Sequence, residues 1–138
     1  MSVFLGFDYG LKRVGVAVGQ RVTASASALS VLKNSGSETL LGEIAGLIST
    51  WRPVGLIVGL PLLEDGFEQP MSIRARRFAA DLEQRFKLPI TLVDERYTSR
   101  SANDDFREAR AAGVARKKHA STLDARAAQR ILQQFLQS

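Results

Sequence analysis

Two short apolar segments at the start of the chain are separated only by a turn. Segments 3–7 and 14–18 are rich in β-branched and aromatic residues, and the short insert between them contains Gly10. This spacing predicts an antiparallel β-hairpin. A third segment, 24–32, is rich in small residues and is a weaker candidate for a strand. The chain is therefore expected to begin with strands that pair with one another.

Strands and helices alternate further along the chain. Apolar residues recur at helical spacing from Ser37, which can cap the helix, as far as Trp51. Buried strands are predicted at 54–58 and 90–93, with a second amphipathic helix at about 75–86 between them. These units predict an α/β fold, in which a five-stranded mixed sheet has an N-terminal antiparallel hairpin, later parallel strands and flanking helices.

The last third of the chain is predicted to be helical. A helix at about 100–112 is expected to end at Gly113, and a terminal helix is expected to begin at Ser121. The short basic segment between them, 114–120, is predicted to be mobile. No repeat or linker divides the sequence, so residues 1–138 are expected to form a single domain.

The net charge of +5 is concentrated at the C-terminal end of the sequence. Residues 1–95 hold ten basic and ten acidic side chains, whereas residues 96–138 hold nine basic and four acidic ones. Such a basic segment favours binding to a polyanion, although solvated helix faces explain the same charges.

The composition excludes several classes of protein. The chain has no cysteine and one histidine, which excludes disulfides and makes a zinc site of the usual Cys/His type implausible. No apolar run approaches the roughly 20 residues that span a bilayer. The start of the sequence lacks the features of a signal peptide. A cytoplasmic protein without membrane association is therefore expected.

Three carboxylates lie where an apolar segment ends or a helix begins. Asp8 follows the first strand, Glu95 follows the last strand, and Asp124 lies at the start of the terminal helix. Ligand sites of such sheets lie at the carboxyl ends of the strands, and oxygen ligands are those that Mg²⁺ and Mn²⁺ prefer. The pattern predicts a metal-dependent nuclease. Alternate residues of a strand face opposite ways, so only one of Asp94 and Glu95 can reach the site.

Each carboxylate also has a purely structural explanation. Asp8 suits a turn, segment 94–96 suits a solvated loop with an internal ion pair, and Asp124 suits the first turn of a helix. However, Asp124 also shares its helical spacing with the apolar Ala128 and Ile131. A buried carboxylate without a partner is costly, and a bound metal removes that cost.

Four segments resemble, in the same order, the signature segments of the YqgF family. They are FDYGLKRVGVAV at 7–18, VGLPL at 58–62 followed by Asp65 and Gly66, VDERYTS at 93–99, and LDARAA at 123–128. This RuvC-like family of the RNase H superfamily is described as Holliday-junction resolvases and as nucleases that mature the 5′ end of pre-16S ribosomal RNA. The resemblance implies an RNase H-like fold with Asp8, Glu95 and Asp124 as metal ligands, and it favours Glu95 over Asp94. Gln20 and Tyr97 depart from the family's pattern.

The resemblance also implies a mechanism. Phosphodiester hydrolysis of this kind uses two Mg²⁺ or Mn²⁺ ions held by the three acids. Basic residues close to the acids are expected to contact phosphates of the nucleic acid, although solvated turns explain their positions equally well. These residues are Lys12, Arg13, Arg96, Lys117 and Lys118.

The substrate remains open between RNA and DNA. A four-way junction requires two coordinated nicks by a symmetric dimer, and no apolar stripe in the sequence indicates a dimer interface. A monomer that acts on a ribosomal RNA precursor is therefore favoured over a Holliday-junction resolvase that acts on branched DNA. Two further alternatives are a non-catalytic ribosome-assembly or nucleic-acid-binding module and an ATPase of the actin type. That ATPase needs two domains around ATP, whereas this chain has room for one.

Overall fold

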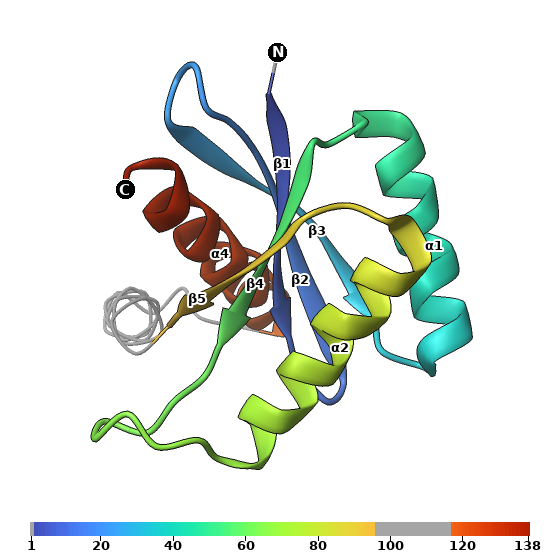
Figure 1. Cartoon of the computed structure of the whole chain (residues 1–138). Helices are drawn as coiled ribbons and strands as arrows, with labels where there is room; N and C mark the ends of the chain where they lie inside the picture. Colours follow the sequence, from blue (N-terminus) through green and yellow to red (C-terminus); the bar gives the residue numbers. More distant parts are fainter. Residues whose placement is uncertain (1, 96–116) are drawn as a thin grey trace.

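The computed structural model describes residues 2–95 and 117–138, with side chains of the last helix from Ala125 onward (Figure 1). The strands are β1 (Val3–Tyr9), β2 (Arg13–Gln20), β3 (Ser25–Lys33), β4 (Gly55–Leu60) and β5 (Ile90–Asp94). The helices are α1 (Ser37–Trp51), α2 (Pro70–Phe86) and α4 (Lys117–Leu136). Within these ranges, no helix has both the length and the apolar character needed to cross a membrane.

The five strands form one mixed sheet in the order β3-β2-β1-β4-β5. β1 pairs antiparallel with β2, and β2 pairs antiparallel with β3. β4 is parallel to both β1 and β5, so the carboxyl ends of these three strands lie at the same edge of the sheet. The predicted five-stranded mixed sheet with an N-terminal antiparallel hairpin is confirmed.

The sheet separates two layers of helices. α1 and α2 cover one face and α4 covers the other (Figure 1). Because successive residues of a strand face opposite ways, Leu5 and Phe7 of β1 enter the core beneath α1 and α2, whereas Phe4 packs beneath α4. The ring of Phe7 meets that of Phe78 edge-on, with 5.7 Å between centroids.

Glycines let α4 lie close to the sheet. A Cβ atom built on Gly6 would lie 2.8 Å from the Cβ atom of Leu132, and one on Gly19 would lie 2.7 Å from Cδ1 of Leu136. Contacts this short do not occur between real side chains, so only glycine fits. Farther along, Phe135 meets Phe4 edge-on at 5.2 Å between ring centroids.

Two glutamines of α4 fix the helix against the edge strand β3. The side-chain oxygen of Gln133 accepts a hydrogen bond from the backbone N–H of Ala26 at 2.8 Å, and its amide donates to the carbonyl of Ala24 at 2.8 Å. Gln129 donates to the carbonyl of Ala26 at 3.0 Å. An edge strand has unpaired backbone groups, and these side chains satisfy several of them. These hydrogen bonds also fix the position of the C-terminal half of α4 relative to β3.

The starts of two helices differ from the sequence-based predictions. α4 begins at Lys117, so residues 117–120 are helical rather than part of a mobile segment, consistent with the good helix propensity of lysine and alanine. Residue Gly36, not Ser37, is the N-cap of α1, and no side chain caps that helix. The helix predicted at about 100–112 and the segment 114–116 lie outside the described residues.

Helix α2 begins at Pro70, earlier than the start at about residue 75 that its apolar residues predicted. Pro70 occupies the first turn, where its missing N–H costs nothing. Gln69 and Ser72 form a capping box, in which the N–H of Gln69 donates to Oγ of Ser72 at 3.0 Å. The hydroxyl of Ser72 in turn donates to the carbonyl of Pro61.

We expect Gly6→Ala to lower the free energy of unfolding by about 1–3 kcal/mol, because the added methyl group displaces α4 from the sheet. Gly42→Ala is the matched control, since a Cβ atom on this exposed helical residue meets nothing within 4 Å. It should instead stabilise the protein by roughly 0.5–1 kcal/mol. Urea unfolding measures both, and equal effects of the two substitutions would contradict the proposed close contact.

Candidate active site

Asp8 lies near the carboxyl end of β1 on the face of the sheet that α4 covers. Its neighbours Phe7 and Tyr9 both face α1 and α2, where they pack against Phe78. The alternation of the strand therefore directs Asp8 to the opposite face. Its cross-strand partner is Gly15 of β2, which adds no side chain beside the carboxylate.

Glu95 follows β5 directly and reaches the same face. Its backbone N–H donates to the carbonyl of Leu60 at 3.2 Å, which continues the pairing of β5 with β4. Val93, two residues earlier, belongs to the cluster beneath α4, so Glu95 faces α4 and Asp94 faces the other way.

The carboxylate of Glu95 occupies space above Gly59 of β4. A Cβ atom on Gly59 would overlap an oxygen of that carboxylate and would lie 2.5 Å from Cδ1 of Ile131 in α4. Any other residue at position 59 would force the carboxylate of Glu95 and the end of the Ile131 side chain to move. This role of Gly59 was not predicted from the sequence, although a glycine inside a buried strand is a recognisable sign of a close approach.

The surroundings of Glu95 make its negative charge unfavourable. Burial, which contributes most, and then the negative charges of Asp8 and Asp94 together raise the pKa of Glu95 from its ordinary 4.5 to about 8. A proton or a cation relieves such crowding of carboxylates. The oxygen donors of Asp8 and Glu95 therefore fit a hard divalent ion such as Mg²⁺ or Mn²⁺.

The third predicted ligand, Asp124, is described only by its backbone. It lies in α4 one turn before Ala128, whose carbonyl oxygen would be 3.3 Å from a Cβ atom on Gly6. Leu136, at the other end of the helix, lies beside Gly19. α4 therefore approaches the carboxyl end of β1, and with it Asp8, toward its N-terminus. The side chains that the structure describes include no cluster of three acids or histidines able to hold a metal, so the full ligand set stays a prediction.

The predicted phosphate contacts are described in part. Lys12 and Arg13 are exposed at the turn between β1 and β2 and line a hollow of about 610 Å³. Lys117 and Lys118 lie in the first turn of α4, with only their backbone described. Arg96 lies outside the described residues.

The same hollow contains a third cation that sequence reasoning did not identify. Lys33 of β3 lines it together with Asn34, and Lys33 is the cross-strand partner of Arg13. The pairing of β2 with β3 shifts between Val16 and Ala17. No sequence pattern reveals such a shift, so the juxtaposition of the two cations could not be predicted.

Comparison with known proteins places the chain among nucleases. A family model described as "RuvX: Holliday junction resolvase" matches residues 2–138. Proteins of Burkholderia ambifaria and Burkholderia lata are each 47% identical over 135 residues, which is 98% of this chain and 89% of theirs. Both are named "Putative pre-16S rRNA nuclease".

Solved structures agree with the fold. RuvC of Thermus thermophilus in complex with a Holliday junction substrate superposes with a TM-score of 0.57 at 17% identity, covering 99% of this chain and 94% of that one. A second structure of that RuvC gives 0.53 at 18% identity, covering 97% and 93%. At this identity the similarity establishes the fold alone, and the predicted RNase H-like fold is confirmed.

In metal-free buffer, Glu95→Gln should stabilise the protein at alkaline pH. Because the folded pKa of about 8 lies above the ordinary 4.5, the folded state binds the proton more tightly, and wild-type stability falls as pH rises between these values. After allowance for solvent screening, we expect a gain of roughly 1–3 kcal/mol at pH 9 that disappears near pH 4.

Urea unfolding in a chelator at several pH values tests this expectation. Glu43→Gln, at an exposed position of α1, is the control and should show no such pH-dependent gain. Added Mn²⁺ should then raise the stability of wild type more than that of Glu95→Gln, because ligand binding stabilises only the folded state. A difference between wild type and Glu95→Gln that does not change with pH would contradict the described environment of Glu95.

Proposed function

We propose that this chain, which belongs to the RuvX family, is a metal-dependent nuclease that processes the 5′ end of pre-16S ribosomal RNA. Family membership confirms the resemblance to the YqgF family and the predicted class of enzyme. The chain is a nuclease, a hydrolase of phosphodiester bonds. The observation that carries the metal dependence is the crowding of Asp8 and a buried Glu95 on one face of the sheet.

In this proposal, Asp8, Glu95 and Asp124 hold two Mg²⁺ or Mn²⁺ ions. When bound, these ions supply activation of the attacking water and stabilisation of the leaving oxygen. The protein positions the carboxylates that would hold these ions. Asp8 lies in β1, and the backbone N–H of Glu95 is hydrogen-bonded to Leu60 of β4. Gly59 leaves the space that the carboxylate of Glu95 occupies.

Basic side chains beside the acids would orient the substrate. Lys12 and Arg13 project from a short turn that begins two residues after Asp8, so they can hold phosphates next to the one that is cleaved. Lys117, Lys118 and Arg96 are proposed to contact phosphates in the same way. Such contacts place the phosphodiester without reading its sequence.

A ribosomal RNA precursor is the proposed substrate because relatives at 47% identity are named for it. Single-stranded RNA also presents an accessible backbone to exposed cations. We further propose that residues 1–138 act as one nuclease domain, as a monomer in the cytoplasm and without membrane association. Holliday-junction resolution is the second candidate, since the family's description names this activity. A non-catalytic assembly module is the third.

Cleavage assays with pure protein separate these candidates. With Mg²⁺ or Mn²⁺, we expect the ribosomal precursor to be cut, a four-way DNA junction to stay intact, and the mass in solution to be that of a monomer. A dimer that nicks the junction symmetrically and leaves the precursor intact would replace the RNA proposal with the resolvase. Binding without cleavage of either substrate would favour the assembly module.

Substitution of the acids tests the site itself. Asp8→Asn, Glu95→Gln and Asp124→Asn should each reduce metal-dependent cleavage at least 100-fold, since each removes a charged ligand, while circular dichroism shows a folded protein. Asp94→Asn is the matched control, because its side chain faces away from α4, and it should retain most of the activity. Loss of activity in Asp94→Asn together with full activity in Glu95→Gln would reverse the assignment.

A further inference from the structure

A second hollow, of about 210 Å³, lies on the opposite face of the sheet from Asp8. It is bounded by the start of α1, by α2 and by Tyr9, the residue that follows Asp8 in β1. The ring of Tyr9 packs against Phe78, with 4.7 Å between centroids, and forms a rigid wall. The hollow is therefore close to the acids along the chain, although the sheet separates the two.

Two arginines of α2 line this hollow. Arg74 and Arg77 are exposed and one helical turn apart, a spacing at which like charges repel. Asp81 also lines the hollow, and its four-residue spacing from Arg77 predicts an ion pair. Within residues 2–95, however, neither Arg74 nor Arg77 takes part in an ion pair with a described residue. Both guanidinium groups remain available to an anion.

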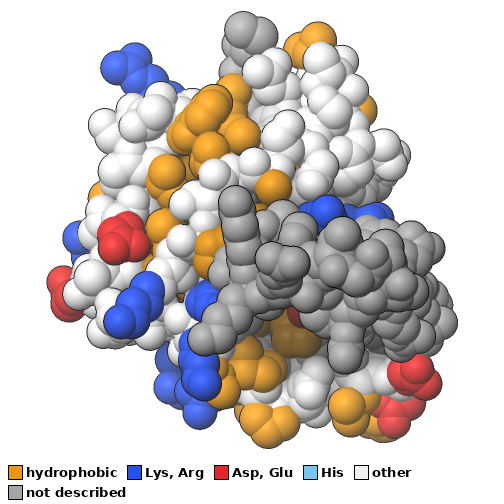
Figure 2. Space-filling view, turned by 180° about the vertical axis from the view of Figure 1, so that it is seen from behind, with side chains coloured by type: hydrophobic (Ala, Val, Ile, Leu, Met, Phe, Trp, Pro, Cys, Tyr) orange, Lys and Arg blue, Asp and Glu red, His pale blue; other side chains and the backbone are white. Residues whose placement is uncertain are grey.

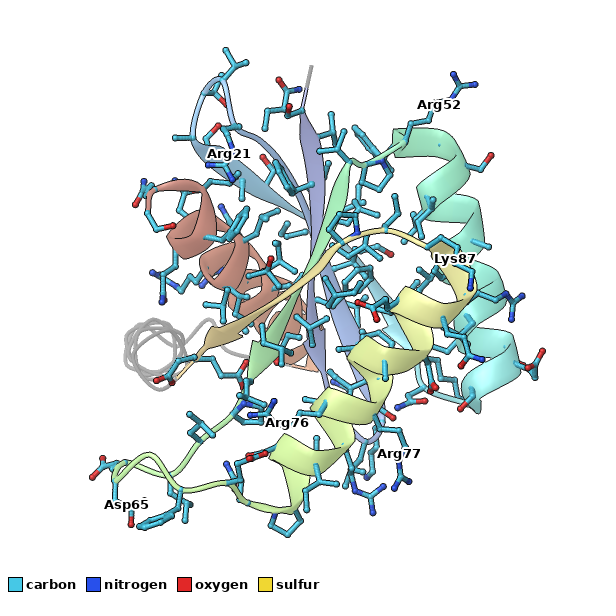
Figure 3. The ribbon with its side chains drawn as sticks, viewed as in Figure 1. Arg21, Arg52, Asp65, Arg76, Arg77 and Lys87 are labelled. Carbon is cyan, nitrogen blue, oxygen red and sulfur yellow. The ribbon has the colours of Figure 1, made fainter. Side chains whose placement is uncertain are left out.

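The arginine that lies between these two in the sequence has an acidic partner. Arg76 forms an ion pair with Glu68, with 2.7 Å between Nε and Oε1. Figure 3 shows Arg76 on the side of α2 that faces the loop before the helix, whereas Arg77 lies toward the turn between β1 and β2. One helix therefore carries both an arginine with an internal partner and two arginines that face a hollow.

Asn34 lies between the two hollows in the sense that it lines both of them. The backbone N–H of Asn34 donates to the carbonyl of Lys12 at 2.9 Å, and its side chain donates to the carbonyl of Gly10 at 2.9 Å. These bonds tie the β1–β2 turn to the end of β3. Among the residues that the structure describes, the larger hollow is lined by three cations and no acidic side chain.

The cations of the larger hollow are also crowded. Arg13 and Lys33 are directly opposite each other in the β2–β3 pairing, where like charges destabilise a sheet. Figure 2, which views the molecule from behind, shows Lys and Arg side chains gathered toward its lower end. An anion bound between such groups would relieve their repulsion.

We infer that the two hollows form one track for the RNA substrate. The track binds the sugar–phosphate backbone of nucleotides that lie away from the phosphodiester bond that is cleaved. The track passes over Lys12, Arg13 and Lys33, turns around the end of the sheet at Asn34, and ends at Arg74 and Arg77. Arginine binds phosphate oxygens through two parallel hydrogen bonds, which suits these groups to positioning a backbone. Two hollows that share a lining residue and carry five cations between them fit a chain of phosphates better than a single small anion. This inference rests on the proposed function and names Arg74 and Arg77 as positioning residues.

The double variant Arg74→Gln, Arg77→Gln tests the track through binding in a chelator, where no cleavage occurs. Single strands of about 20 and about 5 nucleotides probe the whole track and its first part, following the site sizes of single-strand binding grooves. For the longer RNA, we expect the slope of log affinity against log salt to become shallower by about 1.4, since each lost phosphate contact removes about 0.7. The shorter RNA should lose less affinity. Arg76→Gln is the matched control on the same helix and should leave both slopes unchanged.

Each outcome decides the inference. An unchanged slope for the longer RNA in a folded double variant would overturn it, as would weakened binding of inorganic phosphate with RNA binding intact, which would indicate a small-anion site. Cleavage of the ribosomal precursor by wild type is measured separately. Cleavage with an unchanged slope would leave the proposed function standing without the track, whereas a shallower slope without cleavage would support the track and contradict the function.

Discussion

The contact between α4 and the sheet determines where the candidate site can form. Gly6, Gly19 and Gly59 belong to three neighbouring strands, and a Cβ atom on any of them would meet a side chain of α4. A closely packed interior cannot absorb such an atom unless neighbouring side chains or the helix itself move. Since Asp124 is carried by this helix, its distance from the acids of the sheet depends on residues that have no side chain at all.

Further contacts fix the helix along and around its own axis. Gln129 and Gln133 bind backbone groups of β3, and Phe135 packs against Phe4. The guanidinium of Arg21 lies 5.2 Å from the ring centroid of Phe4 and 5.0 Å from that of Phe135, which extends the same contact by cation–π attraction. These interactions all lie in the C-terminal half of α4, away from Asp124. The helix is anchored at one end and carries its acid at the other.

Successive side chains of β1 point to opposite faces of the sheet, so one face forms the main core and the other carries the candidate site. Leu5 and Phe7 enter the larger core beneath α1 and α2, while Asp8 faces α4. The burial of Glu95 beside other carboxylates costs stability, which apolar packing on the opposite face can offset. Functional sites often break the local rules of folding in this way, and the remainder of the structure compensates for them.

Much of this fold could be predicted because its signals are local. The hairpin follows from two β-rich segments around a short turn, and the parallel strands follow from amphipathic helices between apolar runs. The opposite facing of Asp94 and Glu95 also follows from strand geometry, but which of them faces the site depends on where α4 lies, and the resemblance to a family supplied that choice. The start of α4 was misplaced because a run of basic residues is compatible with both a loop and a helix.

Contacts between distant segments could not be predicted in the same way. Gln133 binds Ala26 across 107 positions of the sequence, and no local pattern indicates that a glutamine will complete an edge strand. The pairing of Arg13 with Lys33 depends on an irregularity in the β2–β3 register. The role of Gly59 depends on two other elements that approach it together. Each of these features needs the tertiary arrangement before its partners are known.

The positions of the charged side chains in the folded protein are more informative than the net charge of the sequence. Residues 1–95 have no net charge, yet some of their cations and some of their acids gather in separate places in the folded protein. Among the described residues, Lys12, Arg13 and Lys33 line one hollow without an acid, whereas Asp8 and Glu95 lie close together at the carboxyl ends of β1 and β5. Salt screens exposed charges beyond about 8–10 Å, so a phosphate responds to the groups near it and not to the total. An acidic centre alone would repel a polyanion. The neighbouring basic surface supplies the attraction that lets a phosphate backbone approach carboxylates whose charge a bound cation would neutralise.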